Sequence, residues 1–432
     1  MSHTWNKNIY RQEQEAFVSN HGGTTAREVV YAIMPNICSI LLTTTTLGLL
    51  RGYLHRNVRV ILEFILIVIP SILCCTTLSD HIIAVCFAMM LISIINITIL
   101  GIKSNALSSH SLGPIHNKRP FITNFRALTN IITVICILAI DFRIFPRKFA
   151  KTEIFGYSLM DTGVGLFILA NALVAPEAKD FALKPRVGFF HTVSRNIKQS
   201  AKSCIPLLIL GFGRSVAIEV IGYQKHVTEY GIHWNFFITL AFVKLFTSSI
   251  TSTINSRYSL LSGAWILTMH EYILSTRGLK EWVLSNKPRD DFVSANREGV
   301  VSVPGYVGLY LVGVAIGRLI HSTYQNASAQ KPLQYKPQAF HMKIFGYEFE
   351  GNILIDECEK RATSNTIEIF EAVNYNGLVF FLLSNLTTGS INMLVRTLYV
   401  NQLKALQILI VYTAVNITSV LFLYRKRVQI KL

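Results

Sequence analysis

Charge is scarce in this sequence. Only 15% of its 432 residues are Asp, Glu, Lys or Arg, against about 25% in a typical soluble protein. Apolar residues make up 51% of the chain. A soluble protein of this length would need more charge to cover its surface, so the composition predicts a chain that folds in a lipid bilayer.

Cysteine patterns for disulfides or zinc are also lacking. Of the seven cysteines, only Cys358 lies in a polar stretch. The others fall in or beside apolar runs: Cys38, Cys74, Cys75, Cys86, Cys136 and Cys204. This distribution predicts free, buried thiols, with no disulfide framework and no metal site.

Long apolar runs fill most of the chain. Runs of about twenty residues match a helix that crosses the hydrocarbon core of a bilayer. The alternation typical of barrel strands is absent, so we predict an all-α, polytopic membrane protein with about eleven to thirteen helices. The clearest runs are Val29 to Leu50, Val60 to Leu78, Ile82 to Ile102, Ala127 to Ile140, Ile154 to Ala175, Cys204 to Tyr223, Trp234 to Ile254, Leu260 to Leu274, Val300 to Ile320, Val373 to Leu398 and Ala405 to Tyr424.

The segments around these runs predict how the chain is organised. The first 28 residues are polar, so we expect no cleavable signal peptide and expect the first membrane helix to direct insertion. Residues 29–424 are predicted to form one multi-spanning domain. The polar loop 321–372 interrupts this domain and leaves room for a further short or re-entrant helix. Residues 425–432 form a basic tail.

The net charge of +17 lies mostly between the runs. Lipid headgroups, and not nucleic acid, are the partners that this charge favours. By the positive-inside rule, the more basic side is cytosolic, which places the C-terminal tail in the cytosol and residues 1–28 on the opposite side. The bases of that side are Lys103, Lys118, Arg119 and Arg126 in the third-to-fourth loop, Lys179 to Lys202 in the fifth-to-sixth loop, and Arg425, Lys426 and Arg427.

A charged segment, DFRIFPRKFAKTE, follows the fourth run from Asp141 to Glu153. Other unusual polar segments share its predicted, non-cytosolic side. If they approach one another, they form a polar basin at one membrane face, whereas a transporter is expected to place its polar site near the midplane. We interpret the pattern as an interfacial site for an amphiphile. The segments are SNHGGTT at 19–25, EYGIHWN at 229–235, ANREGVVSVPGY at 295–306 and NLTTGSIN at 385–392.

Together these segments resemble the GPI inositol acyltransferases, which are the animal PIG-W proteins and the fungal GPI-anchored wall transfer proteins. The resemblance extends in order from about Glu15 to about Met393 and is weakest from His321 to Ala372. It implies a multi-pass enzyme of the endoplasmic reticulum membrane, with a lumenal N-terminus and a cytosolic C-terminus in the topology above. It also implies transfer of a fatty acyl group from acyl-CoA to the inositol 2-hydroxyl of glucosaminyl-phosphatidylinositol, in GPI-anchor biosynthesis. Acyl-CoA is then a substrate, and no bound cofactor is expected.

Acyl transfer to an alcohol needs a group that accepts the hydroxyl proton and donors that stabilise the oxyanion. Asp141 ends the fourth run and Lys151 precedes the fifth, and Pro146 between them resists continuous helix. A turn could therefore bring the two together. The resemblance implies that this Asp and Lys carry the activity. We expect Asp141 to act as general base or to polarise the hydroxyl, and Lys151 to act as charge partner or oxyanion donor. The alternative is an ion pair that fixes an interfacial loop.

Other residues are candidates for substrate binding, each with a structural alternative. Arg147 and Lys148 would contact phosphate or merely anchor to headgroups. Asp161, within the fifth run, would line a polar pocket or form an interhelical hydrogen bond. His233 is the alternative general base. It lies with Asn235 at a helix mouth, where interfacial anchors are also common.

Three further candidates lie in the later segments. Asn296 and Arg297 precede the run at Val300, where backbone N–H groups attract phosphate and Arg297 could clamp it. A helix cap without a ligand is an equal alternative. Asn392 could bind a sugar hydroxyl or a neighbouring helix.

Two other functions stay open at this point. A polytopic lipid transporter or scramblase would predict internal repeats and Gly-broken half-helices, which are not evident. A non-catalytic subunit of a membrane complex would tolerate Asn for Asp141 and Gln for Lys151. The acyltransferase is preferred because the ordered segments, their shared face and an acid–base pair agree. The acyl-chain preference, the oligomeric state and the entry route of acyl-CoA are not indicated.

Overall fold

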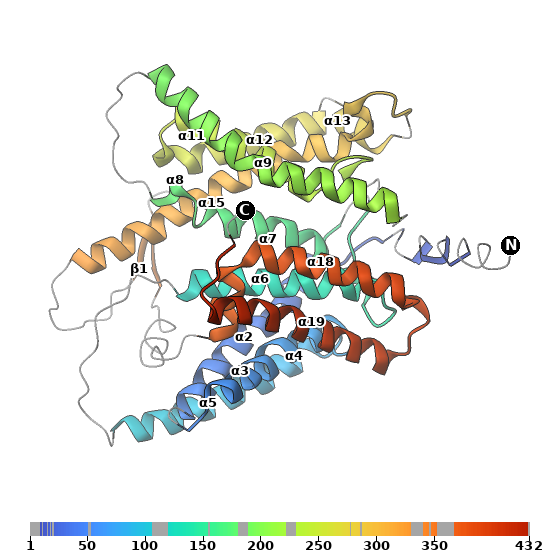
Figure 1. Ribbon diagram of the computed structural model, residues 1–432. Helices are drawn as coiled ribbons and strands as arrows, with labels where there is room; N and C mark the ends of the chain where they lie inside the picture. The colour runs from blue at the N-terminus through green and yellow to red at the C-terminus, as the bar shows by residue number, and fades with distance from the viewer. Residues whose placement is uncertain are drawn as a thin grey trace. The chain divides into compact units, whose positions relative to one another are not determined.

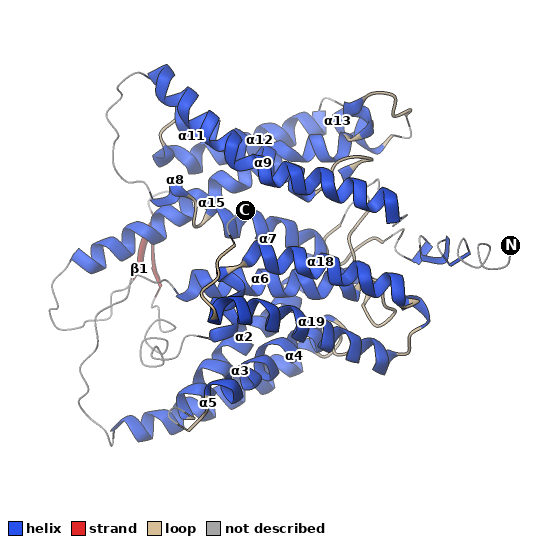
Figure 2. Ribbon diagram, viewed as in Figure 1, coloured by secondary structure: helices blue, strands red, loops and turns tan. Residues whose placement is uncertain are grey.

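The protein is mostly helical in the computed structural model (Figures 1 and 2). The structure describes residues 9–430 except 11, 15, 18, 20, 51–52, 106–119, 154–155, 180–188, 222–229, 277, 286, 330–339, 345–346 and 352–366. The chain divides into two compact units, each made of separate stretches. Unit 1 comprises Met1–Thr25 and Arg147–Gln325, and unit 2 comprises Ala26–Pro146 and Asn326–Lys431.

Unit 2 combines the early and late helices of the sequence. α6 packs against α17, α18 and α19, and α2 packs against α5. A π-helical turn, Phe64–Val68, joins α3 to α4 just before Pro70, whose missing N–H interrupts the regular hydrogen bonds. The elements are α2 (Ala26–Leu49), α3 (Arg56–Glu63), α4 (Ile69–Cys75), α5 (Ile82–Asn105), α6 (Pro120–Ala139), the antiparallel strands β1 (Phe340–Ile344) and β2 (Tyr347–Gly351), α17 (Glu368–Tyr375), α18 (Gly377–Leu394), the 3₁₀ turn η4 (Thr397–Tyr399) and α19 (Gln402–Arg425).

Unit 1 is built from the middle of the sequence. Side-chain caps start several of its helices: Ser158 caps α7, Asn235 caps α11, and Asp291 forms a capping box with Ser294 at α14. Such caps satisfy backbone N–H groups that have no partner inside the helix. The elements are η2 (Arg147–Phe149), α7 (Leu159–Ala172), α8 (Pro176–Lys179), α9 (Phe189–Ile221), α11 (Phe236–Thr253), η3 (Ser256–Tyr258), α12 (Ser259–Thr276), α13 (Leu279–Leu284), α14 (Phe292–Ala295) and α15 (Arg297–Ala329).

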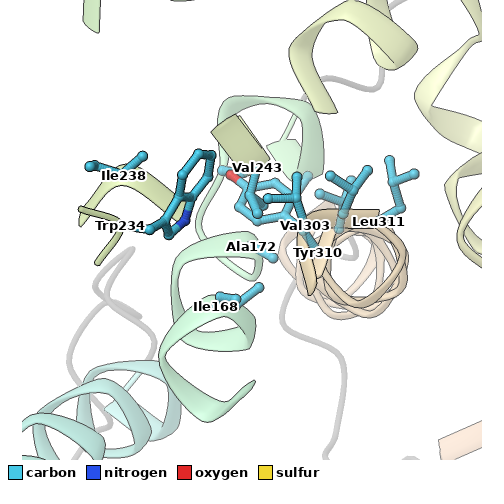
Figure 3. Close-up of a cluster of buried hydrophobic side chains, with 12 residues drawn as sticks. Ile168, Ala172, Trp234, Ile238, Val243, Val303, Tyr310 and Leu311 are labelled. Atoms are coloured by element: carbon cyan, nitrogen blue, oxygen red, sulfur yellow. The ribbon is translucent and has the colours of Figure 1, made fainter. Parts of the chain in front are cut away.

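The core of unit 1 lies between α7, α11 and α15 (Figure 3). α15 approaches α7 through two glycines in a Gly-x-x-x-Gly spacing, which lets membrane helices come into backbone contact. A Cβ at Gly313 would lie 2.6 Å from Ala172 Cβ, and one at Gly317 would lie 2.8 Å from Leu173 O. Buried side chains fill the space around this contact, among them Ile168, Trp234, Ile238, Val243, Val303, Tyr310 and Leu311.

Eight helices of the described chain are long and apolar enough to cross a membrane. They are α2, the continuous helix Arg56–Cys75, α5, α6, α11, α15, α18 and α19. The predicted all-α, multi-pass membrane fold is thereby confirmed. The other predicted spans are helical too, but α7 has only 14 residues, and α9 and α12 are not among the eight. The full number of spans therefore stays a prediction.

Some loop assignments made from the sequence are wrong. Lys103 lies in α5 and Arg126 lies in α6, and not in the loop between them. α9 begins at Phe189, so the predicted loop up to Lys202 is partly helix. The polar segment 321–372 contains the end of α15, the strand pair and the start of α17. Apolarity marks where a helix is covered by lipid, but backbone hydrogen bonds continue into polar sequence.

Glu368 ties three helix ends together at one end of unit 2. Its Oε1 accepts hydrogen bonds from Arg56 Nη2 at 2.7 Å and from Arg425 Nε at 3.0 Å. Arg425 also donates to Asn57 Oδ1 at 2.9 Å. These residues belong to the start of α3, the start of α17 and the end of α19. The segment before α3 and the C-terminal tail therefore lie at the same end of unit 2.

Low pH is expected to weaken the ion pairs of Glu368 with Arg56 and Arg425. Burial raises the pKa of the Glu368 carboxyl, but hydrogen bonds and charges from Arg56 and Arg425 outweigh burial and leave that pKa below its ordinary value. A carboxyl with a lowered folded-state pKa contributes stability above its unfolded-state pKa, about 4.3, and this stability is lost as pH falls through the folded-state pKa. Between about pH 6 and pH 3, the melting temperature should fall more in the wild type than in Glu368→Gln. Parallel melting curves in the two proteins would contradict this role.

Candidate active site

The motif from Asp141 to Glu153 crosses the division between the two units. Asp141 follows α6 in unit 2, whereas Lys151 follows η2 in unit 1. Buried aromatic side chains fix the backbone on both sides of the division, since Phe142 and Phe149 are fully buried. Each predicted catalytic side chain is thus held by its own unit.

Asp141 meets Asn392 within unit 2. The Asn392 Nδ2 donates a hydrogen bond of 2.7 Å to Asp141 Oδ2, across 251 residues of sequence. Asn392 lies in the last turn of α18, and Asp141 lies just after α6. An amide donor stabilises a carboxylate and fixes its orientation. Two residues from separate predicted segments are thereby brought together.

A second set of hydrogen bonds, made by Tyr412, connects α6 and α18 about two helical turns from the Asp141–Asn392 hydrogen bond. The Tyr412 hydroxyl of α19 lies 3.0 Å from Thr388 Oγ1 and 3.1 Å from Ser384 O, both in α18, and 3.4 Å from Val134 O in α6. Ser384 and Asn392 are eight residues apart along α18, and Val134 and Asp141 are seven apart along α6. Both helices therefore rise by about 10–12 Å between the two sets of hydrogen bonds. The contacts follow the same order along both helices, so α6 and α18 lie side by side and run parallel, with Tyr412 bonded to both.

Sequence reasoning missed Tyr412, which lies inside the last apolar run. The spacing of polar residues along α18 is the signal that could have indicated this region. Ser384, Thr388 and Asn392 recur every four residues and therefore share one face of the helix. On that face, Ser384 and Thr388 contact the Tyr412 hydroxyl, and Asn392 contacts Asp141.

The bases of the motif lie against aromatic rings in unit 1. Lys151 Nζ is 4.4 Å from the ring centroid of Tyr230, and Arg147 Cζ is 4.1 Å from that of Phe17. Lys148 Nζ lies 5.5 Å from the ring of the next residue. Cation–π contacts orient a cation without neutralising it. The Lys151 ammonium is thus placed beside Tyr230 of the EYGIHWN segment.

Asp161 anchors the loop before α7. Its Oδ2 accepts hydrogen bonds from the Thr152 hydroxyl at 2.9 Å, the Thr152 N–H at 3.2 Å and the Ser158 hydroxyl at 2.8 Å. Ser158 in turn accepts from the Asp161 N–H. These bonds fix the residues that directly follow Lys151. A contact between Asp161 and substrate stays a prediction.

The segment SNHGGTT packs on this same loop. Thr24 N donates to Tyr157 O at 2.7 Å, and Glu153 N donates to His21 O at 3.3 Å. The first hydrogen bond forms an antiparallel bridge. Two of the predicted polar segments are therefore in contact within unit 1.

Asn296 joins two other predicted segments in unit 1. Its Oδ1 accepts hydrogen bonds from the N–H groups of His233 at 2.8 Å and Trp234 at 3.0 Å. Its Nδ2 donates to Phe292 O at 2.8 Å. Asn296 is completely buried, so these bonds account for a side chain that would otherwise be costly to bury. Asn296 holds EYGIHWN against ANREG, and its contact with substrate stays a prediction.

Asn235 and His233 have contrasting surroundings. Asn235 Oδ1 accepts from Phe237 N and Ile238 N, and its Nδ2 donates to Gly211 O of α9 at 2.8 Å. The His233 side chain is exposed, and no described residue forms a hydrogen bond with its imidazole. A general base is usually oriented by a further group. The described chain supplies such a group for Asp141 and not for His233.

Arg297 is almost completely buried and turns toward backbone carbonyls. It donates to Ser285 O, and to Lys287 O at 3.5 Å. Its Nε lies 3.5 Å from Glu298, which also pairs with Arg289 at 2.5 Å. These contacts fix the segment before α14. A phosphate contact of Arg297 stays a prediction.

Known proteins resemble the chain along nearly its whole length. The family model described as GWT1 matches residues 10–348 and 341–423. An uncharacterized protein of Arabidopsis thaliana is 35% identical over 81% of this chain and 83% of its own. The GPI-anchored wall transfer protein 1 of Gibberella zeae is 32% identical over 94% of this chain and 95% of its own. The phosphatidylinositol-glycan biosynthesis class W protein of Dictyostelium discoideum is 28% identical over 98% and 99%. With this coverage and identity, the chain belongs to the GWT1 family.

Proposed function

We propose that this protein is an acyltransferase of GPI-anchor biosynthesis in the endoplasmic reticulum membrane. It moves a fatty acyl group from acyl-CoA to the inositol 2-hydroxyl of glucosaminyl-phosphatidylinositol. The names of two relatives, GPI-anchored wall transfer protein 1 and phosphatidylinositol-glycan biosynthesis class W protein, support the role. The observation that carries the proposal is the Asp141–Asn392 hydrogen bond, because it supplies an oriented carboxylate in the motif of the family resemblance.

In the proposed reaction, Asp141 accepts the proton of the inositol 2-hydroxyl while the hydroxyl oxygen attacks the thioester carbon. A C–O bond forms, and the Lys151 ammonium stabilises the oxyanion of the tetrahedral intermediate. The C–S bond then breaks, and the proton held by Asp141 passes to the leaving thiolate of CoA. Asn392 keeps the carboxylate oriented during both proton transfers.

The other predicted residues have supporting roles in this proposal. Arg147 and Lys148 contact phosphate of the lipid substrate. His233 is the alternative base. A further set contributes to substrate binding by fixing segments of unit 1. Asp161, Asn235 and Asn296 fix the loops that carry Lys151 and His233, and Arg297 fixes the segment before α14.

We further propose a cytosolic C-terminus and a lumenal N-terminus. Arg56 and Arg425 meet at one end of unit 2, and Asp141 lies at the end of α6 and α18 that points away from it. The positive-inside rule favours a cytosolic position for the basic end. A cysteine placed at the exposed Lys426 should react with a membrane-impermeant maleimide in sealed microsomes. Labelling only after permeabilisation would reverse the orientation.

Acyl transfer itself is the test of the function. Microsomes that lack the endogenous enzyme would receive this protein, acyl-CoA and glucosaminyl-phosphatidylinositol. An inositol-acylated product that requires both substrates supports the proposal. A lipid transporter or scramblase, which the relatives' names do not favour, would redistribute the lipid without forming this product. The proposal fails if the protein is folded and inserted but no product forms.

A further inference from the structure

Arg126 is a charged side chain inside a candidate membrane span. It lies six residues after Pro120 in α6, within the span Phe121–Ala139, and its side chain is partly buried. Across the described part of the chain, its guanidinium has no hydrogen-bond or ion-pair partner. An ionisable group within a span is costly unless it faces a partner, a ligand or the membrane interface, so such a residue is a candidate for a functional site.

Three other arginines in candidate spans have hydrogen-bond or ion-pair partners within the protein. Arg59 pairs with Glu63 at 3.1 Å, and Arg297 donates to backbone carbonyls. Arg318 donates to a carbonyl of α8 at 3.2 Å and to a serine hydroxyl of η3 at 2.8 Å. Arg126 differs from these three arginines because no described residue forms a hydrogen bond or an ion pair with its guanidinium.

Two buried amide oxygens, one on α6 and one on the neighbouring helix α17, also lack partners in the described chain. Asn130 Oδ1 and Asn374 Oδ1 are both buried, and neither accepts a hydrogen bond from a residue that the structure describes. Asn130 lies one turn after Arg126 on the same face of α6. Its Nδ2 is 3.8 Å from the position of a Cβ at Gly377, the first residue of α18. Asn374 lies three residues before Gly377 in α17, which packs against α6.

A cation and two buried acceptors are complementary to a ligand that carries an anionic group together with N–H or O–H donors. We propose that Arg126, Asn130 and Asn374 bind the phosphates and the pantetheine arm of acyl-CoA. The inference rests on the proposed function. Phosphate pairs with the guanidinium, and the two amide N–H groups and the hydroxyl of pantetheine are donors for the asparagine oxygens.

The spacing along α6 favours acyl-CoA over the lipid as the source of this phosphate. Arg126 and Asp141 are 15 residues apart, or about 22 Å of helix. In glucosaminyl-phosphatidylinositol the phosphate is on the carbon next to the reacting 2-hydroxyl, so it must stay near Asp141. In acyl-CoA the pantetheine arm separates the phosphates from the thioester. Arg126 can therefore hold the phosphates while the thioester extends toward Asp141.

This arrangement also supplies an entry route for the donor. α6 runs parallel to α18, so Arg126 lies in the half of α6 nearer to the Glu368 end of unit 2. The proposed topology puts that end on the cytosolic side. Acyl-CoA then enters from the cytosol with its phosphates at Arg126, and its thioester and acyl chain extend toward the carboxylate at the opposite end.

Equilibrium binding of a thioether analogue of acyl-CoA to the purified protein tests the site without turnover. Arg126→Gln is expected to raise the Kd by about tenfold or more, because phosphate loses its charged partner. Arg126→Lys keeps the charge and should retain most of the affinity. Arg214→Gln, at an exposed position of α9, should bind like the wild type. Wild-type affinity in a folded Arg126→Gln protein would overturn the proposal.

A second variant, Asn130→Asp, distinguishes loss of the binding site from loss of the fold. Asn130→Asp places a carboxylate one turn from Arg126, where it should pair with the guanidinium and compete with phosphate. We expect this variant to keep its melting temperature and to lose affinity for the analogue. Unchanged affinity in Asn130→Asp would argue against a phosphate at Arg126.

Transfer kinetics distinguish the two phosphate sources. In Arg126→Gln the KM for acyl-CoA should rise while the KM for glucosaminyl-phosphatidylinositol stays constant. A rise confined to the KM for the lipid would assign Arg126 to the lipid headgroup and refute the acyl-CoA site. Failure of the proposed function is separable, since the wild type would then bind the analogue without transferring an acyl group. A wild type that does not bind the analogue would refute the site directly.

Discussion

Asp141→Asn is expected to reduce acyl transfer to glucosaminyl-phosphatidylinositol by a factor of about 10²–10⁴, the usual contribution of a general base. Asparagine keeps the shape of the side chain, and its oxygen can still accept the hydrogen bond from Asn392, but it cannot accept the hydroxyl proton. The fold should persist because buried Phe142 and Phe145 fix the turn after α6. The measurement is the initial rate in microsomes that contain matched amounts of each protein.

Asp80→Asn is the matched control for this substitution. Asp80 is an exposed aspartate of the same unit, in the turn before α5. The same chemical change there should leave the rate at the wild-type level. If Asp141→Asn retains activity, Asp141 is structural and His233 becomes the base to test. If Asp80→Asn loses activity as well, the loss in Asp141→Asn cannot be assigned to catalysis.

Gly231→Ala is expected to destabilise unit 1 strongly. Gly231 has a φ of 103°, which L side chains rarely adopt, and a Cβ there would lie 2.4 Å from Asn296 Cα and 2.6 Å from Ala295 O. Because the neighbouring atoms are backbone, the two segments must separate, and the hydrogen bond from His233 N to Asn296 Oδ1 must lengthen. Strain and lost hydrogen bonding should together lower the free energy of unfolding by about 3 kcal/mol or more. Thermal unfolding in detergent measures the loss.

Gly278→Ala separates the strain of a positive φ from the steric contact. Gly278 has a φ of 69°, but the nearest neighbour of a Cβ there would be Glu281 Oε2, at 3.7 Å. Its cost should therefore be the backbone strain alone, about 1–2 kcal/mol. Equal losses in the two alanine variants would show that the contact between Gly231 and the ANREG segment contributes nothing measurable.

The fold class was predictable because a span in lipid obeys a local rule. Each backbone group must be paired within its own segment, so a long apolar run becomes a helix whatever its neighbours are. The runs that begin at Val29 and Ala405 correspond to α2 and α19 within a few residues. Pairings between runs follow no such rule. Asp141 and Asn392 were each recognisable as candidates, but their hydrogen bond depends on how α6 packs beside α18.

Two further residues show that the surroundings of a side chain were harder to predict from the sequence than the fold class. Asn296 was predicted as a phosphate or cap residue, yet its oxygen accepts from two N–H groups more than sixty residues away in sequence. Arg126 precedes the apolar run at Ala127 and was therefore assigned to a loop. Pro120, which is favoured in the first turn of a helix, is the local signal that would have extended α6 across Arg126.

The division of unit 2 between two distant stretches has a consequence for biosynthesis. A chain that grows at about 5–20 residues per second needs roughly 12–50 s to add the 251 residues between Asp141 and Asn392. During that interval the ribosome makes all of the second stretch of unit 1, and α6 is already in the membrane without α17, α18 or α19. A nascent chain interrupted before α17 would keep most of its hydrophobic helices and yet lack the hydrogen bond from Asn392 to Asp141. Completion of the last three helices is therefore the step of synthesis at which Asp141 gains its hydrogen-bond donor from α18.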